Sequence, residues 1–99
     1  MHIIVWEFTV RPERLREFAE AYGAEGAWAE LFRRGRGYLG TELLQDTTTP
    51  HRFVTIDRWE SEGDYVAFQQ ECGEEYRALD VQLEGMTTAE SRLGALTQA

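Results

Sequence analysis

Residues 2–10 read HIIVWEFTV, a run of β-branched and aromatic side chains with a single carboxylate in its second half. This composition is typical of a β-strand that meets apolar surroundings on both faces. Alternation along a strand places Ile4, Trp6 and Phe8 on one face and Glu7 on the other. The stretch therefore predicts a central strand whose two sides both need a cover.

Outward from this strand, the apolar spacing alternates between helical and extended patterns. Pro12 suits a first helical turn, and Ser61 followed by Asp64 resembles a capping box. The pattern predicts helices over residues 12–22, 28–32, 61–72 and 76–83, a hairpin of strands over 38–46 and 52–60, and a last strand over 86–97. This order is β-α-β-β-α-β with split helical segments, which predicts an α+β fold of the ferredoxin-like type.

The length and charge of the chain limit its organisation and its partners. Ninety-nine residues fit one domain, residues 1–99, because a second would leave each half too small a core. A net charge of -8 repels phosphate backbones and anionic lipid, so we expect neither nucleic acid nor membrane as a partner. Cys72 is the single cysteine, and no spacing of His and Cys predicts a metal site. The expected compartment is the cytoplasm.

The apolar character of both strand faces favours a homodimer. Helices from so short a chain can cover one face of the sheet, and large side chains on the other face would remain in water. We expect Ile4, Trp6 and Phe8 to form the dimer interface, with a second copy packed face to face. The same alternation then directs Glu7 toward the helices.

Four segments, taken together, resemble a known family. They are Phe8–Pro12, Gly37–Leu43, Asp57–Ser61 and Glu90–Gly94. Their order and spacing resemble the antibiotic biosynthesis monooxygenase superfamily of dimeric α/β barrels. The resemblance implies a ferredoxin-like protomer, paired through its sheet, with a pocket between sheet and helices. Similar proteins include oxygenases that attack phenols and quinols without metal or flavin, haem-degrading enzymes, and members without known activity.

The haem-degrading branch has a motif that can be compared position by position. Its Asn, Trp and His positions fall on Glu7, Phe68 and Ala78, so all three are replaced. Without the axial imidazole, haem lacks its expected ligand. The resemblance therefore favours a monooxygenase that oxidises a small aromatic or quinol-like compound with O2 and without any cofactor. The alternatives are a non-catalytic homodimeric binder of small molecules and a haem or tetrapyrrole binder with different ligands.

An oxygenase of this kind needs a base in an aromatic cavity shielded from water. Glu7 is the predicted catalytic carboxylate, because burial under the helices would raise its pKa into a useful range. An ion pair with Arg58 or Arg92 is the structural alternative. Aromatic side chains at helical spacing are the predicted ligand-binding residues, with ordinary core packing as the alternative. They are Tyr22, Trp28, Tyr65, Phe68 and Tyr76.

Overall fold

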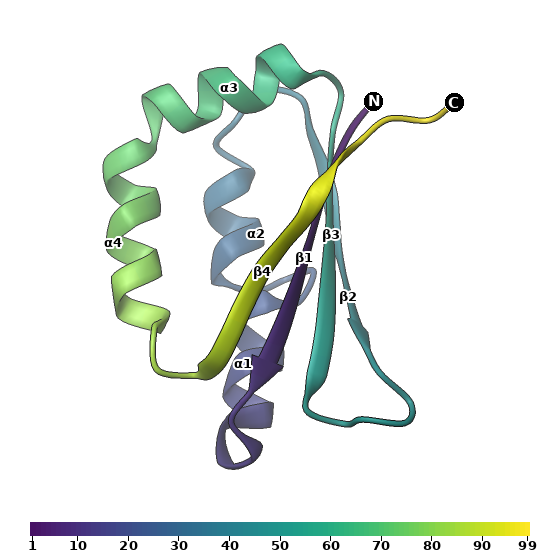
Figure 1. Ribbon diagram of the computed structural model, residues 1–99. Helices are drawn as coiled ribbons and strands as arrows, with labels where there is room; N and C mark the ends of the chain where they lie inside the picture. The colour runs from purple at the N-terminus through teal and green to yellow at the C-terminus, as the bar shows by residue number, and fades with distance from the viewer.

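The computed structural model describes residues 1–99 as one four-stranded sheet with helices on one side (Figure 1). Along the chain the elements are β1 (His2–Val10), a 3-10 turn (Pro12–Arg14), α1 (Leu15–Tyr22), α2 (Ala27–Phe32), β2 (Tyr38–Gln45), β3 (Arg52–Trp59), α3 (Glu62–Glu71), α4 (Gly73–Leu83) and β4 (Thr87–Leu96). The predicted β-α-β-β-α-β order with split helices is confirmed. No helix is both long enough and apolar enough to cross a bilayer.

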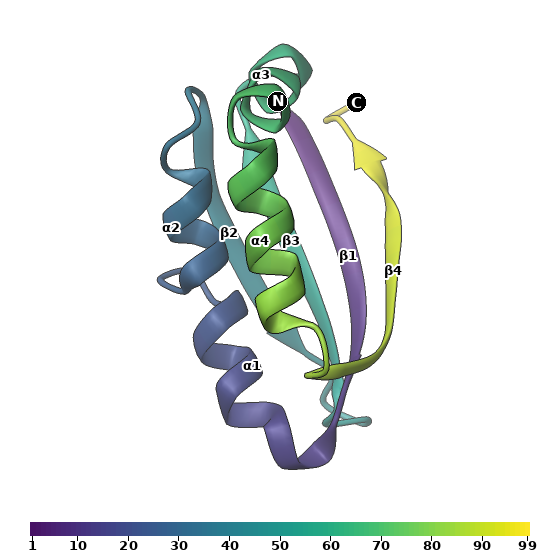
Figure 2. The same cartoon turned by 90° about the vertical axis from the view of Figure 1, so that its left-hand side faces the viewer.

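The strands lie in the order β2-β3-β1-β4, and every neighbouring pair is antiparallel. The predicted central strand, β1, is therefore bordered on both edges. Viewed from the side, α1, α2 and α4 stand in front of the sheet and α3 crosses its upper end (Figure 2). Both termini lie at this upper end, and the opposite face of the sheet carries no helix (Figure 1).

Local signals in the sequence set several of these boundaries. Pro12 opens the 3-10 turn that leads into α1, where its fixed φ angle is tolerated. Ser61 caps α3 by accepting a hydrogen bond from the backbone N–H of Asp64 at 3.1 Å, as the capping-box spacing predicts. Gly73 is the first residue of α4, so the helical segment divides at the predicted place.

The structure reverses the expected assignment of the two β1 faces. Ile4 and Phe8 are 2% and 4% exposed and lie in the core under the helices, and Trp6 packs against that core. Glu7 lies on the uncovered face. Alternation determines which residues share a face, but the helices cover the side on which β1 and β3 together offer the larger apolar surface. Opposite Phe8 lies Phe53, and opposite His2 lies Trp59, which is fully buried.

The uncovered face of the sheet has an apolar centre flanked by ion pairs. Side chains of β1 and β3 that point away from the helices form this centre, and none of them is fully buried: Ile3, Val5, Val54 and Ile56. Toward one end, Arg52 Nε donates to Glu7 Oε2 at 2.6 Å. Toward the other, Arg58 pairs with Glu42. We call this surface, centred on these four aliphatic residues, the open face.

Candidate functional site

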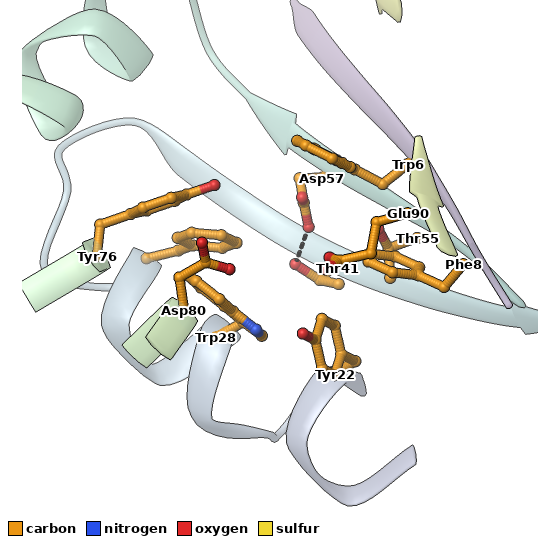
Figure 3. Close-up of a pocket in the computed structure, with 11 residues that line it drawn as sticks. Trp6, Phe8, Tyr22, Trp28, Thr41, Thr55, Asp57, Tyr76, Asp80 and Glu90 are labelled. Carbon is orange, nitrogen blue, oxygen red and sulfur yellow. Dashed lines mark hydrogen bonds between the residues drawn. The ribbon is translucent and has the colours of Figure 1, made fainter. Parts of the chain in front are cut away.

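A cavity of about 280 Å³ lies between the sheet and helices α1, α2 and α4 (Figure 3). Side chains of the strands line one side of the cavity, and side chains of the helices line the other. Its lining residues are Trp6, Phe8, Tyr22, Trp28, Phe32, Thr41, Thr55, Asp57, Tyr76, Asp80 and Glu90. Six of them are aromatic and three are carboxylates, so the wall combines flat apolar surfaces with acidic groups.

Asp57 brings a buried carboxyl group into this cavity from the middle of β3. The residue is 8% exposed, and its Oδ1 accepts a hydrogen bond from Thr41 Oγ1 at 2.6 Å (Figure 3). Burial raises the pKa of Asp57 from its usual 3.8 to about 6, and the Thr41 hydrogen bond only partly offsets that effect. A carboxyl group with such a pKa accepts and releases a proton near neutral pH.

Thr41 connects Asp57 to a second hydroxyl. The Thr41 and Tyr38 oxygens are 2.6 Å apart. Because the Thr41 hydroxyl has one hydrogen and donates it to Asp57, the Tyr38 hydroxyl must donate to Thr41. In the chain Tyr38–Thr41–Asp57, the Thr41 hydroxyl is therefore the one donor to the carboxylate, and it holds the Asp57 side chain in one orientation.

The helical wall supplies neutral polar groups. Burial raises the pKa of Tyr22 to about 12 and raises that of Tyr76 as well, so both hydroxyls keep their protons at neutral pH. Trp28 is 7% exposed, and its indole N–H lies close enough to the Tyr22 hydroxyl to lower the pKa of that group, but the contact does not reach hydrogen-bond geometry. A buried donor without an acceptor is uncommon in folded proteins, and this one belongs to the cavity wall.

Two further carboxylates lie at the cavity rim. Asp80 comes from α4 and Glu90 from β4, on opposite sides of the opening (Figure 3). Burial and then the negative charge of Asp80 raise the pKa of Glu90. The two groups are thus close enough to interact, although both remain exposed to solvent.

Three of the five predicted ligand-binding aromatics line the cavity: Tyr22, Trp28 and Tyr76. The other two do not. Phe68 is 1% exposed and packs on Trp59, so it belongs to the core. Tyr65 packs against Trp59 and accepts a hydrogen bond from Gln69. Both residues lie on α3, which crosses the upper end of the sheet and contributes nothing to the cavity wall.

Glu7, the predicted catalytic residue, lies on the open face and not in the cavity. Its carboxylate pairs with Arg52, whose Nη2 lies 2.5 Å from Glu7 Oε2. The structural alternative of an ion pair is thus the observed one, with Arg52 in place of the expected Arg58 or Arg92. The reversed faces of β1 account for this placement, because Glu7 points opposite to Trp6 and Phe8.

The sequence pattern did not predict the polar residues of the cavity. They are Thr41, Thr55, Asp57, Asp80 and Glu90. For Asp57 a signal exists in β3, since Phe53, Asp57 and Trp59 share one face by alternation. A carboxylate between two large aromatics on one strand face is unusual, and it indicates a buried group with a perturbed pKa.

The lining residues include no His or Cys, and no group of three or more His, Cys, Asp or Glu side chains is placed to hold a metal ion. Asp57, Asp80 and Glu90 offer oxygen atoms, and Trp28 offers one hydrogen-bond donor. The wall is therefore suited to bind a small flat molecule by aromatic contact and a few hydrogen bonds.

The fold and this cavity define a class of protein, the ferredoxin-like domains that enclose a small pocket between an antiparallel sheet and its helices. Residues 1–79 match the model of the family described as antibiotic biosynthesis monooxygenase. The chain belongs to this family, as its resemblance in sequence implies. No curated protein matches the chain.

Solved structures share the fold at low sequence identity. A proposed antibiotic biosynthesis monooxygenase from Deinococcus radiodurans is 17% identical with a TM-score of 0.75, covering 100% of this chain and 93% of that one. A similarly described protein from Bordetella bronchiseptica is 22% identical with a TM-score of 0.73, covering 99% and 96%. SnoaB, a cofactor-independent oxygenase from Streptomyces nogalater, is 20% identical with a TM-score of 0.68, covering 99% and 92%.

Proposed function

We propose that this protein oxidises a small phenolic or quinol-like compound with O2 and without a cofactor, using Asp57 as the base. The observation that carries the proposal is the Asp57 carboxyl group, buried in an aromatic cavity with a pKa raised to about 6. Membership of the monooxygenase family supports it. SnoaB, which shares the fold, is itself a cofactor-independent oxygenase.

The reaction begins with proton transfer from a ring hydroxyl to Asp57. The resulting anion is delocalised onto a ring carbon, which passes one electron to O2, and the two radicals combine into a carbon-bound peroxide. Asp57 returns its proton to the peroxide. The same ring carbon then loses its hydrogen as a proton while the O–O bond breaks, so that a new carbonyl forms and the departing hydroxide takes up that proton and leaves as water. A quinol and O2 thus yield a hydroxyquinone and water, with all four electrons supplied by the substrate.

The surroundings of Asp57 suit this sequence. Thr41 holds the carboxylate in place, and the protonated hydroxyls of Tyr22 and Tyr76 can donate hydrogen bonds to ring oxygens. The helices cover the cavity on the side opposite the sheet, which limits the access of water to the reactive anion and peroxide. A volume of about 280 Å³ lies near the lower end of ligand sites, which span roughly 300–1,000 Å³, and it favours a compact ring system.

The test is O2 uptake by metal-free protein with a panel of quinols and hydroxylated anthrones. We expect Asp57→Asn to lower the rate by roughly 10²–10⁴-fold, which is the usual contribution of general base catalysis. Glu7→Gln is the matched control, because it makes the same carboxylate-to-amide change on the opposite face of the sheet. Its rate should stay within about twofold of the unmodified protein.

Three outcomes would contradict the proposal. Equal rates for Asp57→Asn and the unmodified protein would exclude Asp57 as the base. Ligands that bind without any acceleration of O2 uptake would favour the alternative, a non-catalytic binder with the same cavity. An intense Soret band on titration with haem would instead favour a haem protein.

We also propose that the protein works as a homodimer joined through the open face. Ile3, Val5 and Ile56 lie there partly exposed, and the neighbouring carboxylates are neutralised by Arg52 and Arg58. A net charge of -8 opposes association of two copies. The local ion pairs reduce that repulsion on this surface, which favours a second copy as its cover.

A further inference from the structure

The cavity carries negative charge without any basic counterpart. Three of its eleven lining residues are carboxylates, Asp57, Asp80 and Glu90, and none is Arg, Lys or His. The chain has ten arginines, and the six ion pairs of the structure all lie elsewhere. None of the three carboxylates takes part in them. The lining itself therefore favours cations over anions; β4 carries one arginine, Arg92, which lies opposite Trp6 and outside the lining.

The aromatic wall adds to this preference. Trp28 and Tyr76 lie with ring centroids 4.9 Å apart at an angle of 57°, and Tyr22 and Trp28 lie 6.1 Å apart at 51°. All three rings belong to the cavity lining. The negative π faces of Trp and Tyr attract ammonium groups, and the attraction is stronger where water is excluded.

A second observation also indicates a ligand. The Trp28 indole N–H is buried in the cavity wall and has no hydrogen-bond partner. Figure 3 shows this nitrogen directed into the space between Asp80 and Tyr22. A bound molecule with an acceptor oxygen would satisfy the donor. The missing acceptor and the unpaired carboxylates thus indicate a ligand that carries both an oxygen and a cationic group.

We propose that the cavity selects a small oxygen-bearing aromatic ring with a protonated amine side chain, held by Asp80 and Glu90 at the rim and by the rings of Trp28 and Tyr76. It binds the same ring less tightly when the side chain carries a carboxylate or a phosphate in place of the amine. The inference rests on the proposed function, since it names the class of ligand for the same cavity.

The test compares three hydroquinones that differ only in the end of a two-carbon side chain: aminoethyl, ethyl and carboxyethyl. Binding is measured by calorimetry without O2 at neutral pH. We expect the aminoethyl compound to bind on the order of tenfold tighter than the ethyl compound, and the carboxyethyl compound to bind weakest. Added salt should reduce the difference, because the rim is open to solvent.

Two double variants test whether the rim carboxylates cause the preference for the aminoethyl compound. Asp80→Asn combined with Glu90→Gln should bring the affinity ratio of aminoethyl to ethyl compound close to one. Glu20→Gln combined with Glu74→Gln changes the net charge equally, at positions outside the cavity wall. This control should keep the ratio of the unmodified protein.

The outcomes separate this inference from the proposed oxidation. Equal or tighter binding of the ethyl or carboxyethyl compound, or a ratio unaffected by the rim variant, would overturn the ligand class even if O2 uptake depends on Asp57. Preferential binding of the aminoethyl compound without O2 uptake would uphold the ligand class and overturn the oxidation. Absence of binding by all three would overturn the ligand class, and the O2 uptake panel would still decide the oxidation.

Discussion

Asp57 is the only charged side chain among the buried residues of the structure. Water no longer solvates its ionised form, and one hydrogen bond from Thr41 replaces only part of that solvation. No arginine lies beside it, in contrast to Glu7 and Glu42 on the open face. A group retained at this cost is a candidate for function, because a structural role would be filled at least as well by a neutral residue.

The raised pKa of Asp57 makes stability depend on pH. Its pKa is about 6 in the folded protein and about 3.8 in the unfolded chain, so the folded state binds the proton more tightly. Its contribution is therefore most favourable below about pH 4 and is lost as pH rises through about 6. The loss amounts to about 3 kcal/mol, since one pKa unit corresponds to about 1.4 kcal/mol.

Asp57→Asn removes this dependence. We expect the free energy of unfolding of the variant to rise relative to that of the unmodified protein between about pH 4 and pH 7, by up to about 3 kcal/mol. Urea unfolding of both proteins at a series of pH values measures the difference in their free energies of unfolding. The other carboxylates are present in both proteins, so their contributions cancel in this difference. Parallel stability curves for the two proteins would show that Asp57 titrates normally.

Among the elements, β1 shows the limit of pattern analysis. Its alternation is regular, and both of its faces carry aliphatic or aromatic side chains. The pattern alone does not decide which of the two faces of the strand the helices cover. Pairing with β3 decides between them, because Phe53 and Trp59 join the face of Phe8 and give that side the greater apolar area.

The connection from α2 to β2 contains a glycine in a backbone conformation that other residues rarely adopt. Gly37 has a φ of +86°, in the left-handed region, and it directly precedes β2. An added Cβ there would also collide with the Asp64 side chain. We expect Gly37→Ala to lower the free energy of unfolding by at least roughly 1–2 kcal/mol, measured by urea unfolding.

Gly63→Ala serves as the matched control for that change. Gly63 lies in the first turn of α3, and the nearest atom to an added Cβ is Ser61 Oγ at 3.7 Å. The replacement should leave stability unchanged or raise it by up to about 1 kcal/mol, because Ala favours a helix over Gly. Equal destabilisation by both substitutions would contradict the strain argument at Gly37.

At the scale of the whole molecule, one side of the sheet is covered and the other is open (Figure 1). Burial of the open face would remove Ile3, Val5, Val54 and Ile56 from water, at roughly 25 cal/mol per Å² of apolar surface. The cavity lies on the covered side and is lined from within one copy of the chain. Association through the open face would therefore leave the cavity accessible in both protomers.

Val5→Glu tests the proposed dimer. Val5 lies near the centre of the open face, opposite Ile56 and Gly94, so a buried charge there would oppose association. We expect sedimentation to show a dimer for the unmodified protein and a monomer for the variant. Val81→Glu is the matched control, since Val81 lies 64% exposed on α4, and it should leave the dimer intact. A dimer that persists in Val5→Glu would place the interface elsewhere.

The order of elements and their boundaries followed from local signals in the sequence. Pro12, the Ser61 cap, the break at Gly73 and the helical spacing of Tyr22 and Trp28 act within a few residues of chain. Such interactions involve residues that are close along the chain, so a pattern along the chain is sufficient to predict them. The family resemblance was visible for the same reason, because it consists of strand ends, turns and caps.

Only the tertiary structure decided which face of β1 is covered and which carboxylate enters the cavity. Glu7 and Asp57 both lie on strands beside apolar residues, and the sequence pattern favoured Glu7. Their environments differ because the helices bury the face of the sheet that carries Asp57, whereas Glu7 lies on the open face. There Arg52 contacts both Asp46, which is six residues away in sequence, and Glu7, which lies on the neighbouring strand. Burial and charge pairing depend on neighbours that are distant along the chain, and these neighbours are brought together only when the sheet and helices pack.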